Sequence, residues 1–188
     1  MKTILELKNQ FISDTESQLK ELKYFQALTD YQLNWKISGD SWSIAECIDH
    51  LCVTNKLYID EFEKQFSQKQ IKADCSKTSV KHRFLGRFII KSVDPDNLKK
   101  IKTFPVFQPS GSNHTKEVLT RYSDLQNEFI NLLSSVKDLD LNKYKMSSPA
   151  SKLIKENFCD VLEIIRLHDK RHFLQAKRVI DHPNFPRE

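Results

Sequence analysis

Glycine and proline are scarce in this sequence, whose 188 residues include three glycines and six prolines. Both residues mark the tight turns that a sheet-rich protein needs at short intervals. Charged residues make up 29% of the chain, and in long stretches the apolar residues recur every three or four positions, which is the spacing of one helix face. The sequence therefore predicts an all-α protein.

Long hydrophobic runs are also lacking. No stretch approaches the ~20 apolar residues that a membrane-spanning helix requires. The first ten residues show no basic run followed by an apolar core, as a secretory signal would. We therefore expect no association with a membrane and a cytoplasmic location.

The four cysteines lack the Cys-x-x-Cys spacing of zinc ribbons and redox motifs. Three of them, Cys47, Cys52 and Cys159, lie in apolar helical stretches, where free thiols pack as small hydrophobic side chains. This pattern indicates a reducing compartment.

A nucleic-acid partner is not expected. The net charge of +5 comes from 30 basic and 25 acidic residues spread along the chain. The short basic runs at residues 99–102 and 170–171 accompany no zinc finger, aromatic RNA-binding motif or basic zipper.

Four long amphipathic segments predict the helices. A chain of this length can bury about 70% of its unfolded surface in one core, so we expect a single domain, residues 1–188. Ser43 and Glu46 have the spacing of a capping box and indicate the start of the second helix. The predicted helices span approximately residues 3–28, 43–68, 115–136 and 157–181, and four such helices pack most simply as a four-helix bundle.

The irregular part of the sequence is an insertion between the second and third helices, residues 70–113. A short helix near residues 84–89 is predicted to stop at Asp94-Pro95. Insertions of this length often line a site. Residues 30–40 and the segment around 147–149 are expected to be connections.

The feature with the clearest chemical content is a pair of histidines, His168 and His172, in the apolar stripe of the last helix. Residues four apart on a helix lie ~6 Å from each other on one face, close enough for two imidazoles to bind one ion. A buried imidazole without a partner costs about 1–3 kcal/mol, which a shared metal ion would offset. The alternative is a pair of core histidines that bond to neighbouring helices.

A third ligand should come from a facing helix, and His50 is the best candidate. Surface roles are expected for His82, His114 and His182. Glu46, one turn before His50, is either a general base or a carboxylate that supports the ligands, or only a part of the capping box.

Two rival assignments use Asp169, which follows His168. A zincin would have a glutamate at this position and a third ligand downstream, and neither is present. An "HD" phosphohydrolase would need further histidine and aspartate ligands that the sequence does not supply. Gln175 lies on the same side as His168, where it would contact a water ligand or cap the end of the bundle.

Two segments resemble the signatures of the DinB-like superfamily. Residues 42–51 (WSIAECIDHL) resemble its W-S/T-x-x-E-x-x-x-H-L segment, and residues 168–175 (HDKRHFLQ) resemble its H-x-x-x-H-x-x-Q segment. The resemblance implies a four-helix bundle that carries one divalent ion, nickel or zinc, with water in the open positions. By matching position, the implied metal ligands are His50, His168 and His172.

The resemblance also implies an activity. Some members are thiol-dependent transferases in which the metal binds the sulfur of a low-molecular-weight thiol, such as bacillithiol or mycothiol, and presents it to an electrophilic small molecule. Others are described as metal-dependent hydrolases. A third alternative is a non-catalytic bundle that the metal stabilises and that acts through a partner or as a homodimer.

Overall fold

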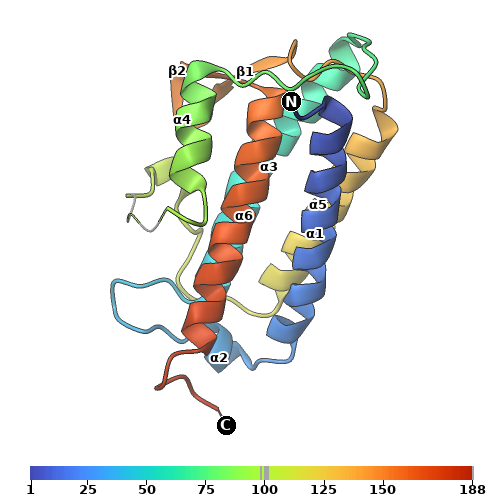
Figure 1. Ribbon diagram of the computed structural model, residues 1–188. Helices are drawn as coiled ribbons and strands as arrows, with labels where there is room; N and C mark the ends of the chain where they lie inside the picture. Colours follow the sequence, from blue (N-terminus) through green and yellow to red (C-terminus); the bar gives the residue numbers. More distant parts are fainter. Residues whose placement is uncertain (98, 100–101, 188) are drawn as a thin grey trace.

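The computed structural model describes residues 1–97, 99 and 102–187, so part of the basic run at 99–102 lies outside it. It is mostly helical, with one small two-stranded sheet, which confirms the predicted all-α class. The four long helices of the bundle are α1 (Ile4–Gln26), α3 (Ile44–Gln68), α5 (Glu117–Ser135) and α6 (Phe158–Ile180) (Figure 1). The smaller elements are α2 (Asp30–Asn34), α4 (Phe84–Val93), the 3-10 turn η1 (Pro105–Phe107), β1 (Lys145–Ser148) and β2 (Ser151–Asn157).

Capping boxes mark where three of the long helices begin. At α3, the Ser43 hydroxyl accepts a hydrogen bond from the Glu46 backbone N–H at 3.1 Å, and the Glu46 carboxylate accepts one from the Ser43 N–H at 2.8 Å. Thr3 and Asn157 play the same part at α1 and α6. These contacts satisfy N–H groups that have no partner in the first turn of a helix. The predicted capping box at Ser43 is confirmed.

The bundle contains one long crossover connection. Both α3 and α5 run toward the end that holds the hairpin, so the chain between them must return along the whole bundle (Figure 1). The 25 residues of α3 span ~38 Å, which explains why residues 69–116 form so long an insertion. Within it, α4 packs along α6.

Two segments that were expected to be plain connections have regular structure. Residues 30–34 form α2, which begins at a capping box between Thr29 and Gln32. The segment around 147–149 is the end of β1 and the turn of an antiparallel hairpin. The prediction was wrong there because a four-residue strand is too short to show a period and is stabilised by pairing with a second strand.

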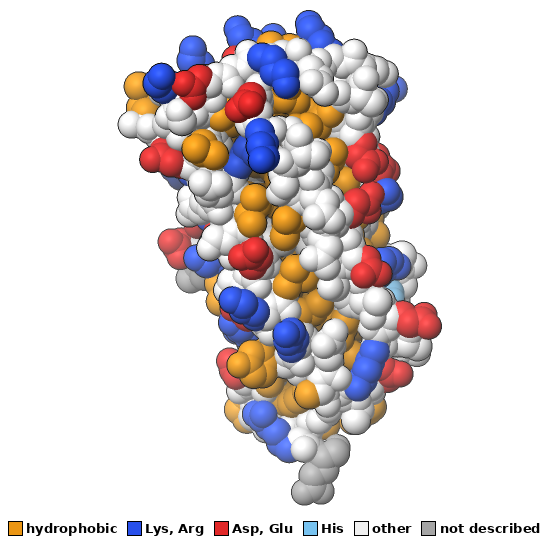
Figure 2. Space-filling model, turned by 90° about the vertical axis from the view of Figure 1, so that its right-hand side faces the viewer, with side chains coloured by type: hydrophobic (Ala, Val, Ile, Leu, Met, Phe, Trp, Pro, Cys, Tyr) orange, Lys and Arg blue, Asp and Glu red, His pale blue; other side chains and the backbone are white. Residues whose placement is uncertain are grey.

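The core consists of two apolar clusters, one toward the hairpin and one toward α2. The four cysteines are buried and free, in agreement with the prediction for three of them. On the face that Figure 2 shows, charged side chains of both signs are interspersed with hydrophobic ones, as on a solvated bundle surface. Among the described residues, no helix combines the length and the apolar character needed to cross a membrane.

Candidate metal centre

Three histidines from two antiparallel helices converge on one point. His50 comes from α3, and His168 and His172 come from successive turns of α6. The Nε2 atom of His168 lies 3.1 Å from that of His50 and 3.1 Å from that of His172. Each ring offers a nitrogen within 4.8 Å of the other two, so the group can hold one metal ion. The structure therefore brings together all three residues that the sequence singled out as ligands.

The orientation of His50 is set by the crossover connection. Its Nδ1–H donates to the carbonyl oxygen of Phe107, in η1. A proton on Nδ1 leaves the lone pair of the neutral ring on Nε2, which is the atom that faces His168. A main-chain carbonyl 57 residues away leaves no signal in the sequence, so sequence reasoning missed this contact.

All three rings are held in the neutral form by their surroundings. Burial lowers the pKa of His50 to about 4, although the hydrogen bond to Phe107 acts in the opposite direction. Burial, followed by the neighbouring histidines, lowers the pKa of His168 and His172 well below the usual value. For His172, a contribution from Gln175 opposes this effect. A neutral imidazole is the form that binds a metal ion.

The contacts among these rings fit a bound cation better than a set of hydrogen bonds. Because the proton of His50 is on Nδ1, its Nε2 can only accept. His168 Nε2 can either donate to His50 or accept from His172, so the two 3.1 Å contacts cannot both be ordinary hydrogen bonds. A shared cation would satisfy the three lone pairs together. Trp42 covers the group, with its ring centroid 4.8 Å from that of His50 and 5.6 Å from that of His172.

The chain was compared with models of protein families. Residues 15–176 fit the model of the DinB superfamily, and this range includes the three histidines and most of the bundle. The chain belongs to the DinB superfamily. No match was found among curated proteins or among solved structures.

Asp169 does not face the metal-binding group of this DinB protein. Its fully buried carboxylate accepts hydrogen bonds from Asn55 at 3.0 Å, Tyr122 at 2.8 Å and Gln126 at 2.9 Å. Burial raises the pKa of Asp169 to about 7, and the three hydrogen bonds act against this rise. The zincin and "HD" assignments fail here, because both need the acidic residue at the metal.

Hydrogen bonds to Asp49 attach the crossover connection to α3. Its carboxylate, on the residue before His50, accepts from the backbone N–H and the hydroxyl of Ser110 and from the guanidinium of Arg121. His114 Nε2 lies 3.7 Å from the same carboxylate. Together with the bond from His50 to Phe107, these contacts hold residues 107–114 against the metal-binding group. The end of the predicted insertion thus lies beside the candidate metal-binding group, and its role in lining a site stays a prediction.

Glu46 is occupied by two structural contacts. One carboxylate oxygen accepts from the Ser43 N–H of the capping box, and the other pairs with Lys36 Nζ at 2.6 Å. The catalytic role of Glu46 stays a prediction.

Two of the other three histidines differ from the expected surface roles. His82 is half-buried and bonds through Nδ1 to the buried carboxylate of Asp160 at 2.9 Å. His114 is held by the carbonyl of Gly111 and by its approach to Asp49. The surface assignment of these two residues is therefore wrong. Each ring lies beside a buried carboxylate from a distant segment, Asp160 for His82 and Asp49 for His114. The ring of His182 lies 5.6 Å from that of Trp35.

Proposed function

We propose that this DinB protein binds one divalent ion, nickel or zinc, through His50, His168 and His172 and transfers a low-molecular-weight thiol to an electrophilic small molecule. The family and the convergent histidines support the metal. Three neutral ligands leave the full +2 charge available, so a bound ion would act as a Lewis acid that favours the thiolate form of a coordinated thiol. Imidazole suits both nickel and zinc.

The observation that favours a thiol over water is the state of the neighbouring carboxylates. Asp49, Asp169 and Glu46 stand beside or one turn from a ligand, and each already accepts hydrogen bonds from other protein groups. A hydrolase usually needs a general base within reach of the attacking water. A thiol depends less on a general base, because its pKa of ~8.5 lies close to neutrality and a metal can lower it further.

The protein's own residues position the ligands and limit the access of water. Phe107 orients His50, while Trp42 covers one side of the rings. His168 is only half-buried, whereas His50 and His172 are 3% and 8% exposed.

The first test is metal analysis of protein purified without a histidine tag. We expect one divalent ion per chain in the native protein and less than a tenth of that in His168→Ala/His172→Ala. The matched control, His182→Ala, removes a histidine outside the group and should keep the full content. An equal metal content in the double variant would refute the assignment of the ligands.

The second test distinguishes thiol from water as the nucleophile. The protein is loaded with cobalt and titrated with bacillithiol, mycothiol and cysteine, and the absorption bands of the metal should shift for at least one of them. Turnover is then measured with electrophilic thiol acceptors and with esters and amides. Cleavage of esters or amides without a thiol would instead establish a hydrolase.

A further inference from the structure

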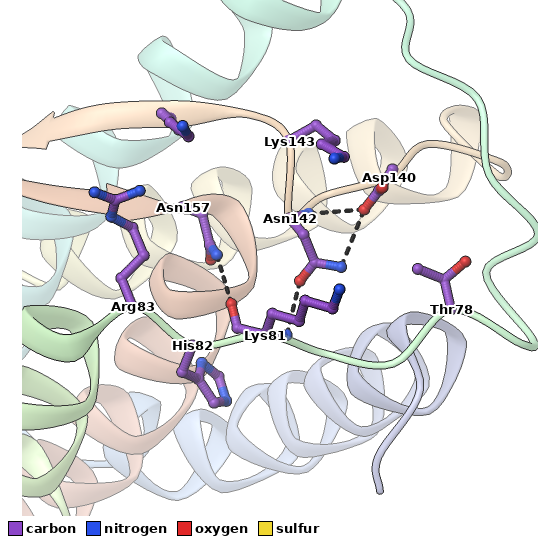
Figure 3. A pocket seen from close by; sticks show the side chains of 9 residues that line it. Thr78, Lys81, His82, Arg83, Asp140, Asn142, Lys143 and Asn157 are labelled. Atoms are coloured by element: carbon purple, nitrogen blue, oxygen red, sulfur yellow. Dashed lines mark hydrogen bonds between the residues drawn. The ribbon is translucent and has the colours of Figure 1, made fainter.

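A cavity lies at the hairpin end of the bundle. Its volume is about 330 Å³, and it lies between the segment that leads into α4 and the turn before β1 (Figure 3). It shares no residue with the metal-binding group or with the carboxylates beside that group. The lining residues are Thr78, Lys81, His82, Arg83, Asp140, Asn142, Lys143, Lys145 and Asn157.

The charge of this lining is strongly positive. The lining includes four cations, Lys81, Arg83, Lys143 and Lys145, and one carboxylate, Asp140, so these five groups carry a net charge of +3. In the described part of the chain, none of the four cations forms an ion pair, whereas Lys36, Lys56 and Lys177 elsewhere each have a carboxylate partner. Like charges that share a concave site repel one another, so this arrangement favours an anion among them.

Two amide side chains, one half-buried and one buried, hold the backbone around the cavity. The Asn142 side chain accepts from the Lys81 N–H at 2.8 Å and donates to the Ser79 carbonyl at 3.1 Å. Asn157, which is 3% exposed, donates to the Lys81 carbonyl at 2.6 Å. Figure 3 shows the bonds from Lys81 to Asn142, which lies on the turn that carries Lys143, and from Lys81 to Asn157. The backbone that carries Lys81 is therefore held in place before a ligand binds, which reduces the entropy cost of binding.

The donors available match a tetrahedral dianion. Arg83 is oriented by a bond from its Nε to the Lys155 carbonyl, at 3.0 Å, and its two Nη groups make no hydrogen bond within the described residues. A guanidinium fork of this kind binds phosphate through paired N–H groups, and lysines add point charges. The volume is that of a small-molecule site, and the cations surround a hollow rather than follow a stripe, which argues against a nucleic-acid strand.

We propose that this cavity binds a small phosphorylated molecule through its phosphate group. The full-length protein is titrated calorimetrically with inorganic phosphate and with glycerol phosphate at low ionic strength. We expect one site per chain, with binding that weakens as salt screens the charges. Lys81→Gln and Lys143→Gln should each weaken binding roughly tenfold, equivalent to about 1.4 kcal/mol. The control, Lys20→Gln, changes an exposed lysine on α1 and should leave binding unchanged.

The same titration on His168→Ala/His172→Ala separates this site from the metal. Binding that persists in this variant supports the cavity, whereas binding that disappears there would place the phosphate on the metal and overturn the proposal. Lack of binding to both probes at millimolar concentration would also overturn it. So would an affinity unchanged in the Lys81→Gln/Lys143→Gln double variant, whose exposed substitutions should preserve the fold, as circular dichroism would check.

Discussion

The buried side chain of Asp169 connects three helices of the bundle through hydrogen bonds. Its carboxylate is the shared acceptor for donors on two other helices, Asn55 of α3 and Tyr122 and Gln126 of α5. This polar group lies between the two apolar clusters and directly follows a proposed metal ligand in the sequence. Asp169 therefore links three helices of the bundle and supports the turn of α6 that carries His168.

Removal of this carboxylate should destabilise the fold. Asp169→Ala would leave the buried donors of Asn55 and Gln126 without an acceptor, at about 1–3 kcal/mol each, and Tyr122 with only a 3.4 Å bond to Gln18. We expect a loss of roughly 3 kcal/mol or more in the free energy of unfolding, measured by urea denaturation of the metal-free protein. The control is Asp60→Ala, because the ion pair of Asp60 with Lys56 is exposed and should contribute less than about 1 kcal/mol. Equal losses in both variants would contradict this account of Asp169.

At the scale of elements, the crossover connection is attached to α3 by a few polar contacts rather than by a large apolar face. Ser110 and Phe107 provide two of these contacts, to Asp49 and His50. Segments held in this way open locally at a low free-energy cost. The orientation of one metal ligand thus depends on a segment outside the four main helices.

Ser110→Ala should loosen this segment. The hydroxyl donates to the Asp49 side chain at 2.9 Å, and loss of this bond would cost about 1.5 kcal/mol, roughly tenfold in the opening equilibrium. Hydrogen exchange of peptides that cover residues 104–112 should accelerate by about that factor. Ser67→Ala, which removes an exposed bond to the Lys64 carbonyl, serves as the control and should leave this segment unchanged. Unaltered exchange in Ser110→Ala would show that other contacts hold the segment.

The packing of α4 on α6 depends on a glycine. A Cβ atom added at Gly86 would lie 2.3 Å from Cγ of Asp160, and that carboxylate is held by bonds from His82 and from the N–H groups of Arg83 and Asn157. The side chain therefore cannot easily move away. Only glycine allows the two helices to approach so closely.

Two glycine substitutions test this contact. Gly86→Ala should lower the free energy of unfolding by about 1–3 kcal/mol, because overpacking outweighs the better helix propensity of alanine. Gly39→Ala, with no atom within 4 Å of the added Cβ, should be neutral or stabilising by less than about 1 kcal/mol. Thermal unfolding of both variants measures the difference. A stabilised Gly86→Ala would mean that α4 can shift on α6 without cost.

At the scale of the whole molecule, Glu156 makes stability depend on pH. This residue of β2 is fully buried, and neither carboxylate oxygen has a hydrogen-bond partner within the described residues. Burial, with Asp160 as a second cause, raises the pKa of Glu156 from 4.5 to about 7. Between these two values the folded protein binds more protons at Glu156 than the unfolded chain does. The free energy of unfolding should therefore decrease as pH rises through this window.

Glu156→Gln should remove this dependence. A pKa difference of this size corresponds to about 3 kcal/mol, fully present as a stabilising contribution below the unfolded pKa and lost above the folded one. We expect the variant to gain stability relative to the native protein between about pH 5 and pH 8, as measured by denaturant unfolding across that range. Glu128→Gln, at an exposed position of α5, should follow the native curve. Parallel curves for Glu156→Gln and the native protein would exclude this role.

The long helices and the ligand candidates could be predicted from the sequence alone. Helix periodicity, capping boxes and the spacing of His168 and His172 depend on residues three or four positions apart, where the geometry of one backbone settles which side chains meet. The DinB motif around His50 supplied the third ligand in the same local way. These interactions could be predicted because they depend on residues within one helix and not on how the helices pack.

The surroundings of the ligands follow from how the helices and connections pack, and the sequence did not predict them. His50 meets His168 across 118 positions of sequence and Phe107 across 57, and Asp169 meets Asn55 across 114. The hairpin and the basic cavity are likewise formed by separate segments, and the sequence of each segment taken alone does not predict them. Contacts of this kind arise when rigid elements pack and every buried donor must find an acceptor, so they depend on the arrangement of the whole chain.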